Sequence, residues 1–179
     1  GATKMMSEVA IGDRVQVYSA ETGSTEFSDV IAVPHASNDV LATFVEINTA
    51  SGSVKMTPDH LVAAGSCSAA NTMLPLVRSE DVKVGDCVNT VEGQSMVSSI
   101  NTVDEKGIYT IVTRGEFLVV GNIVASPFAV NHNILHFFYN LHRALPTGSP
   151  LVAAFHAVAD QITKIAVLPV IRSVFAVSA

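Results

Sequence analysis

The stretch Ser7-Glu8-Val9-Ala10-Ile11-Gly12-Asp13-Arg14-Val15 returns, with a slip of one residue, as Ser79-Glu80-Asp81-Val82-Lys83-Val84-Gly85-Asp86-Cys87-Val88. The copies share Ser-Glu, then Val or Ile, Gly, Asp, any residue and Val. A second pair of similar segments, 44–52 and 108–115, follows in the same order. Repetition at a fixed offset indicates a repeated structural unit, and two copies are too few for a solenoid. We therefore predict one domain built from two related halves.

The two halves differ in one short polar segment. The first half continues into Thr57-Pro58-Asp59-His60, whereas the comparable place in the second half reads Val119-Val120-Gly121-Asn122. Histidine is the side chain whose ordinary pKa lies closest to neutral pH. A cluster that can handle protons is therefore present in only one half, and we expect the chemistry of the protein there.

Composition limits the class of protein. The chain has 179 residues, of which 49% are hydrophobic and 15% charged, with a net charge of −6. This length suits one domain plus an appendage, and there is enough apolar material for a core. The negative charge and the lack of a basic run argue against a nucleic-acid partner, because such binding neutralises phosphates.

The sequence contains two cysteines, Cys67 and Cys87. Their spacing fits no metal motif. A disulfide is one interpretation, but we favour two buried free thiols, because an unpaired cysteine behaves as a small apolar residue. The redox compartment is therefore left open by the cysteines.

Residues 9–125 are typical of an all-β body, because short β-prone runs alternate with turn residues. Pro34 should end one of these runs. The segment 50–52 should turn between two strands that form a hairpin, and the same pattern recurs around Arg114-Gly115 and Gly121-Asn122. The expected strands include 15–18, 30–33, 44–47 and 53–56.

The composition changes after Pro127. Apolar residues at helical spacing predict a helix within 131–145, and 146–150 reads as a linker. The segment 151–179 is strongly apolar, and its longest run without charge is too short to span a bilayer. It could be a helix packed on the β body, a recognition element for an acceptor molecule, or a contact with a membrane surface; we favour packing slightly.

Three histidines, His132, His136 and His142, invite a metal interpretation. The first two are four residues apart and share one face of the predicted helix. No acidic partner or further ligand follows at a convincing spacing, so we favour packing or capping over zinc.

In this setting, after a strand and inside a duplicated β domain, Thr57-x-x-His60 resembles the Hint family. These are the self-processing domains shared by hedgehog C-terminal regions and inteins. The resemblance to the hedgehog-like branch covers residues 1–145, followed by the linker 146–150 and the extension 151–179. The matching elements, in order, are 4–8, 11–15, 44–52, 57–62, 82–86, 107–109, 113–115 and 125–130.

The resemblance implies an all-β, pseudo-two-fold Hint fold with a C-terminal helical extension, and autoprocessing as its function. In the family, a cysteine at the first position attacks the preceding carbonyl, and the resulting thioester is released by a second nucleophile, a sterol in true hedgehogs. The resemblance assigns His60 as general acid/base and Thr57 as the group that polarises the scissile amide. On an extended Thr-x-x-His segment the two side chains would converge on one peptide bond. No cofactor or metal is implied, the partner is the protein's own upstream segment, and the expected location is the secretory pathway.

The sequence also departs from the family pattern. The nucleophilic cysteine and the first strand are not in this sequence, so the chain by itself should be inactive in the reaction. Ser126-Pro127-Phe128-Ala129 stands where hedgehogs have Ser-Cys-Tyr-Ala, and His35, with Asp39 nearby, stands where sterol-using members have an activating Asp. Water or another small nucleophile is thus as good an acceptor as a sterol. Asp59 is expected to be solvated or to stabilise a turn. The alternative is a degenerate Hint fold that serves as an interaction or apolar-ligand-binding module.

Overall fold

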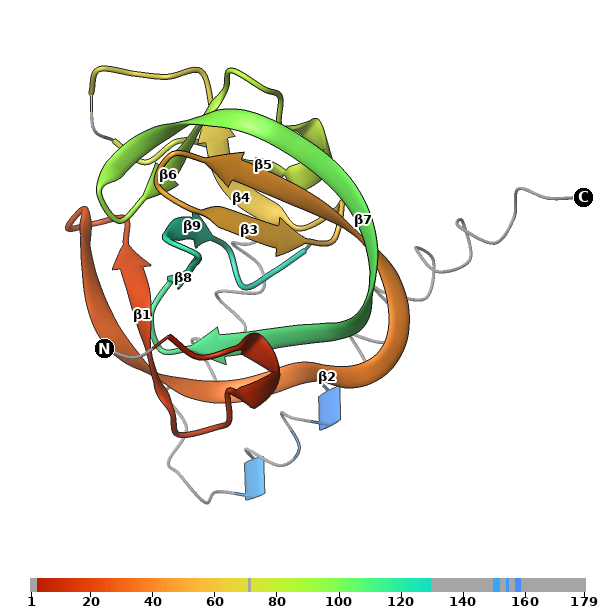
Figure 1. Cartoon of the computed structure of the whole chain (residues 1–179). Coiled ribbons are helices and arrows are strands. Elements are labelled where there is room, and N and C mark those ends of the chain that lie inside the picture. Colours follow the sequence, from red (N-terminus) through yellow and green to blue (C-terminus); the bar gives the residue numbers. More distant parts are fainter. Residues whose placement is uncertain (1–2, 71, 130–149, 152–153, 155–156, 159–179) are drawn as a thin grey trace, which may run out of the picture. The chain divides into compact units, whose positions relative to one another are not determined.

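The first part of the chain is an all-β unit. The computed structural model describes residues 3–70, 72–129, 150–151, 154 and 157–158. The chain divides into two compact units, Gly1–Asn133 and Ile134–Ala179. The described part of the first unit contains strands and two short 3-10 turns, which confirms the expected all-β body (Figure 1).

The strands form one antiparallel, hydrogen-bonded array. Its order is β1-β8-β9-β4-β6-β7-β2-β3; β5 adds to β4, and β1–β2 and β9–β6 pair in addition. The 3-10 turns are η1 (Met6–Glu8) and η2 (Ser79–Asp81). The strands are β1 (Arg14–Ser19), β2 (Ser24–Thr49), β3 (Ser53–Met56), β4 (Leu61–Gly65), β5 (Leu76–Arg78), β6 (Cys87–Thr90), β7 (Gly93–Thr113), β8 (Phe117–Val120) and β9 (Ile123–Ala125).

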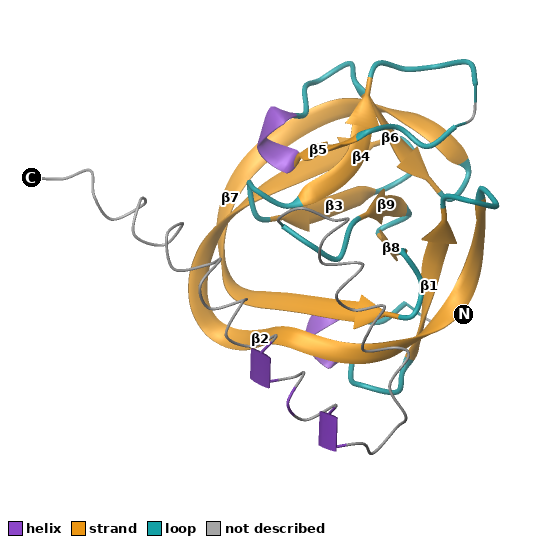
Figure 2. Ribbon diagram, turned by 180° about the vertical axis from the view of Figure 1, so that it is seen from behind, coloured by secondary structure: helices purple, strands orange, loops and turns teal. Residues whose placement is uncertain are grey.

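Two long strands, β2 and β7, pair with each other and curve around the shorter strands (Figures 1 and 2). The prediction that Pro34 ends a short strand was wrong, because β2 continues through it to Thr49. Pro34 lies between Ala32 and His35, at one of the register shifts of the β2–β7 pair. At such an irregularity the N–H that proline lacks is not needed for the ladder.

Two of the three predicted hairpins are confirmed. β2 pairs with β3 across 50–52, and β8 pairs with β9 across Gly121-Asn122. Both residues of the second turn have positive φ, 55° and 69°, as a two-residue type I′ hairpin requires. The third expectation was wrong, because β8, which comes after Arg114-Gly115, pairs with β1 and β9. A turn signal in the sequence does not determine with which strand the following strand pairs.

The duplicated stretch has the same local structure in both copies. Asp13 Oδ2 accepts from Ala10 N at 2.8 Å, and Asp86 Oδ2 accepts from Lys83 N at 2.8 Å. The glycine before each aspartate has φ near 90° (93° and 94°). In each copy the carbonyl of the aspartate then accepts a hydrogen bond from a valine at 2.8 Å in the following long strand, Val30 or Val97. The repeat is therefore structural, as the sequence predicts.

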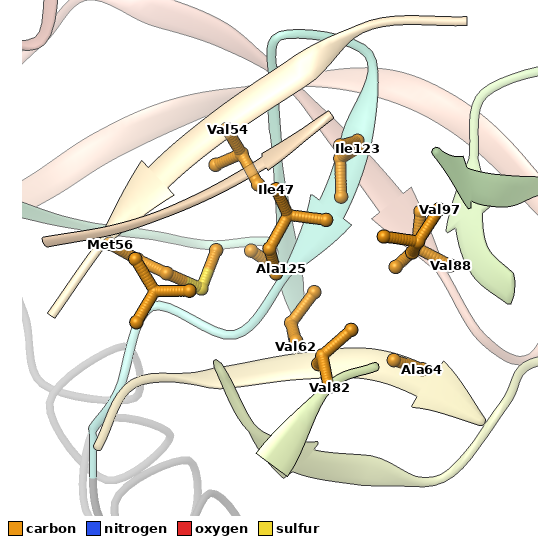
Figure 3. Close-up of a cluster of buried hydrophobic side chains, with 11 residues drawn as sticks. Ile47, Val54, Met56, Val62, Ala64, Val82, Val88, Val97, Ile123 and Ala125 are labelled. Atoms are coloured by element: carbon orange, nitrogen blue, oxygen red, sulfur yellow. The ribbon is translucent and has the colours of Figure 1, made fainter. Parts of the chain in front are cut away.

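The main core cluster lies between the long strands and the short central ones. Its buried side chains point toward one another (Figure 3). Ile47, Val62, Val88 and Ile123 are fully buried, and each such side chain contributes about 1.5–3 kcal/mol relative to exposure. The full cluster is Val45, Ile47, Val54, Met56, Val62, Ala64, Val82, Val88, Val97, Ile123 and Ala125. This core fixes β4, the strand that comes directly after Thr57-x-x-His60.

Cys67 and Cys87 form a disulfide, so the expectation of two free thiols was wrong. The segment after β4 returns to the start of β6, which brings the two Cα atoms to 4.9 Å. That approach depends on the tertiary path of the loop and has no local signature. The same loop is also held by Asn89, whose Oδ1 accepts from Leu74 N at 2.7 Å.

We expect loss of this disulfide to lower the free energy of unfolding by about 2–4 kcal/mol, because the bond closes a loop in the unfolded chain. The measurement is urea unfolding of the wild type and of a Cys67→Ala/Cys87→Ala double variant. A reductant should destabilise the wild type and leave the double variant unchanged. Equal stability of the oxidised wild type and the double variant would contradict the prediction.

Most expectations for the C-terminal part lie outside the described residues. These are the helix within 131–145, the three histidines His132, His136 and His142, and the linker 146–150 except Pro150. Of the extension 151–179, the structure describes a few positions with helical backbone, and these do not establish the expected helix. Within the described residues no helix is long and apolar enough to cross a bilayer.

Candidate active site

Thr57 and His60 are the two ends of one tight turn between β3 and β4. His60 N donates to Thr57 O at 2.9 Å, with Pro58 and Asp59 in the two central positions, where proline's fixed φ is favourable. The segment is thus a turn and not extended, contrary to the sequence-based expectation. The turn brings the two residues closer, because the ends of such a turn lie within about 7 Å of each other.

His60 lies at the start of β4, between two neighbouring strands. On one side β5 pairs with β4 (Leu61 opposite Arg78), and Ser79 N donates to His60 O at 2.8 Å. On the other side β9 pairs with β4, and Ser126 N donates to Leu61 O at 3.0 Å. The backbone around the histidine is therefore fixed from both sides.

The ring of His60 is held by a backbone carbonyl. His60 Nε2 lies 2.7 Å from Ser126 O. A carbonyl oxygen only accepts hydrogen bonds, so Nε2 must carry the hydrogen. In the neutral ring, Nδ1 is then the atom with the free lone pair. Nδ1 can therefore take up a proton and pass it on without breaking the contact with Ser126.

The environment of His60 favours the neutral ring. Burial lowers the pKa of His60, opposed by the hydrogen bond to Ser126 and the nearby Asp59 carboxylate. The residue as a whole still keeps some exposed surface. A histidine in this state can act as a proton acceptor at neutral pH and as a donor once it has been protonated.

We expect His60 to make folding stability depend on pH. Its pKa is lower in the folded protein than in the unfolded chain, so its stabilising contribution is full above the ordinary value of about 6.5 and is lost as pH falls through the folded-state value. In His60→Gln the free energy of unfolding should therefore fall less steeply below about pH 6.5. Urea unfolding at a series of pH values tests this; equal slopes in both proteins would contradict it.

The structure places the sequence-predicted residues on two elements. Thr57 and His60 share the turn before β4 and are half-buried. His35 lies in β2 opposite Thr110 of β7, because the strand continues through Pro34. Asp59 occupies a central position of the Thr57–His60 turn and is partly buried. Among the described residues, no group of three or more His, Cys, Asp or Glu side chains is arranged to hold a metal ion.

Two further residues contact the site directly, and the sequence analysis did not predict either of them. Ser126 binds the His60 ring through its carbonyl, and Ser79 binds the backbone of the turn. Ser79 belongs to the repeated Ser-Glu phrase, but the repeat gave no signal for its contact with the turn. For Ser126, the sequence offered only its place in the motif Ser126-Pro127-Phe128-Ala129, and nothing that indicated a contact with His60.

The sequence and the fold that carry this site have relatives among known proteins. The family model described as "Hint module" matches residues 1–165. The chain belongs to the Hint family. Of the relatives, Warthog protein 1 of Caenorhabditis elegans is 28% identical over 153 residues, which cover 79% of this chain and 31% of that protein. Protein hedgehog of Drosophila persimilis is 31% identical over 137 residues, covering 73% of this chain and 28% of that protein.

The fold of this Hint domain is shared with inteins. An intein-like domain from Clostridium thermocellum superposes with a TM-score of 0.52 at 15% identity, covering 68% of this chain and 86% of that domain. The chain thus has the all-β Hint fold, as the sequence resemblance implied. It spans less than a third of the length of the warthog and hedgehog relatives.

Proposed function

We propose that this Hint domain supports self-cleavage of the natural protein that contains it, through a thioester. The observation that carries the proposal is the setting of His60: its Nε2 is held by Ser126 O at 2.7 Å, and burial lowers the pKa of the ring. A fixed, neutral imidazole whose Nδ1 can exchange a proton is suited to the departure of an amide nitrogen.

The proposed chemistry has two steps. The thiol of a cysteine upstream of the chain gives its proton to Nδ1 of His60 as its sulfur attacks the carbonyl carbon of the residue before it, and the C–N bond breaks. Nδ1 passes that proton to the departing nitrogen, which becomes an amine, while Thr57 polarises the amide. A small nucleophile then attacks the thioester carbon, and the thiol is regenerated. Each molecule would react once.

We assign activation of the second nucleophile to His35, by its family position. It is partly exposed and lies within β2 beside a register shift, and bulges re-aim side chains next to active sites. Water, a sterol or another small nucleophile remain the candidate acceptors. We propose that residues 1–145 form the processing domain and that 146–150 form a linker. The extension 151–179 would cover the β body, recognise the acceptor or contact a membrane surface.

We also propose that the protein passes through the secretory pathway. The Cys67–Cys87 disulfide supports this, because disulfides persist in oxidising compartments. The relationship to hedgehog and warthog proteins supports it as well.

The test is cleavage of the natural precursor, followed on a denaturing gel and by mass spectrometry. A thiol such as dithiothreitol would also reduce the disulfide, so two reagents separate the effects. Hydroxylamine attacks thioesters without reducing disulfides, whereas a phosphine reduces disulfides without cleaving thioesters. We expect cleavage with hydroxylamine, a hydroxamate on the released segment, and no acceleration by the phosphine.

His35→Ala separates the two steps. It should slow cleavage by the natural acceptor and leave hydroxylamine-driven cleavage in place, because hydroxylamine needs no activation. If the precursor is not cleaved by hydroxylamine, the proposal fails and the non-catalytic alternative, an interaction or apolar-ligand-binding module, is favoured.

A further inference from the structure

The two copies of the repeated Ser-Glu phrase differ in their contacts. Each serine lies in a short 3-10 turn that precedes a Gly-Asp turn and a strand, but Ser79 is the first residue of η2 whereas Ser7 is the second residue of η1. Ser7 is exposed, whereas Ser79 has 0% of its surface exposed. Ser79 is buried against the Thr57–His60 turn, which its hydroxyl contacts directly.

Ser79 and its neighbour bind three carbonyl groups of that turn. Ser79 Oγ donates to Thr57 O at 2.9 Å and to Pro58 O at 3.1 Å, sharing its one hydrogen between them. Ser79 N donates to His60 O at 2.8 Å, and Glu80 N donates to Pro58 O at 3.0 Å. The backbone of the turn is therefore held over its whole length by the start of η2.

These contacts act on the backbone of the turn itself. The ring of His60 has its hydrogen bond to Ser126 on one side, and β4 fixes only the residues after the histidine. Between Thr57 and His60 the turn has a single internal hydrogen bond. A shift of the turn would move the hydroxyl of Thr57 relative to the imidazole, and a misplacement of about 1 Å can cost about 100-fold in rate.

We propose that Ser79 is a positioning residue of the Hint reaction: its buried hydroxyl fixes the Thr57–His60 turn so that both side chains face the same peptide bond. The proposal rests on the proposed function, because positioning has a catalytic meaning only if His60 and Thr57 act in cleavage.

The experiment compares Ser79→Ala with Ser79→Thr and with Ser7→Ala, a control at an exposed serine in the short 3-10 turn of the other half. Hydroxylamine-driven cleavage of the precursor is measured at a temperature at which circular dichroism shows every variant to be folded. We expect Ser79→Ala to cleave about tenfold more slowly, Ser79→Thr to recover most of the rate because it keeps the hydroxyl, and Ser7→Ala to match the wild type.

A second measurement does not depend on cleavage. Titration of the His60 ring by NMR in the 179-residue chain should give a pKa closer to the ordinary value in Ser79→Ala, because a loosened turn exposes the ring, and no change in Ser7→Ala. A wild-type cleavage rate together with a wild-type His60 titration in Ser79→Ala would overturn the inference and leave the proposed function standing. Failure of the wild-type precursor to cleave would instead reject the proposed function.

Discussion

We expect His60→Ala to slow hydroxylamine-driven cleavage of the precursor by about 100- to 10,000-fold, the usual contribution of a positioned general acid or base. An amide nitrogen is a poor leaving group until it is protonated, and the imidazole of His60 is the proposed source of that proton. The ring is held through Nε2 by Ser126 O, so its removal takes away both the proton and its placement.

The control for this variant is Asp59→Asn. Asp59 precedes His60 in the same turn, and its charge raises the pKa of His60, but it is not assigned a proton-transfer role. Its replacement should therefore have a small effect on the rate. Cleavage of His60→Ala at the wild-type rate would remove His60 from the mechanism, and an equal loss in Asp59→Asn would indicate that the turn itself had been disrupted.

The features that could be predicted from the sequence are those with local causes. The repeated Gly-Asp turns form because an aspartate binds the N–H three residues before it, in both copies. The Gly121-Asn122 hairpin forms because its residues tolerate positive φ. The spacing of Thr57 and His60 was also enough to place them on one short segment, although the turn that joins them was not predicted.

The features that could not be predicted depend on contacts between residues that are far apart in the sequence. β2 passes through Pro34 because it pairs with β7, which is distant in the sequence; Thr110, for example, comes 75 positions after its partner His35. Cys67 meets Cys87 because a loop folds back. Ser79 looked like Ser7 in sequence, and only the β4–β5 register brings it against the turn. Local patterns thus identified the proposed catalytic pair and missed the residues that hold it.

The second large effect is expected at the contact between two hairpin tips. Gly121 lies in the β8–β9 turn and Gly52 in the β2–β3 turn. A Cβ on Gly121 would lie 1.9 Å from Ser53 O, and a Cβ on Gly52 would lie 2.0 Å from Gly121 O. Asn122 Nδ2 also donates to Ser51 O at 2.9 Å. The two backbones touch, with no room for a methyl group.

We expect Gly121→Ala to lower the free energy of unfolding by at least about 3 kcal/mol, since overpacking against well-fixed neighbours reaches or exceeds this cost. The atoms in the way are backbone atoms of β3, which cannot rotate aside as a flexible side chain can. Domains of this size have about 5–15 kcal/mol of stability in total, so the loss would be a large part of it. Urea and thermal unfolding measure it.

Gly85→Ala separates the clash from the effect of positive φ. Gly85 has φ +94°, but a Cβ there would meet nothing within 4 Å, so only the backbone penalty of about 1–2 kcal/mol applies. A clearly larger loss in Gly121→Ala than in Gly85→Ala would show that the close approach of the tips requires glycine. Equal losses would mean that the two hairpin tips can separate. The contacts of Gly121 would then hold β3 less firmly than the structure indicates, and the turn that carries Thr57 and His60 would also be held less firmly.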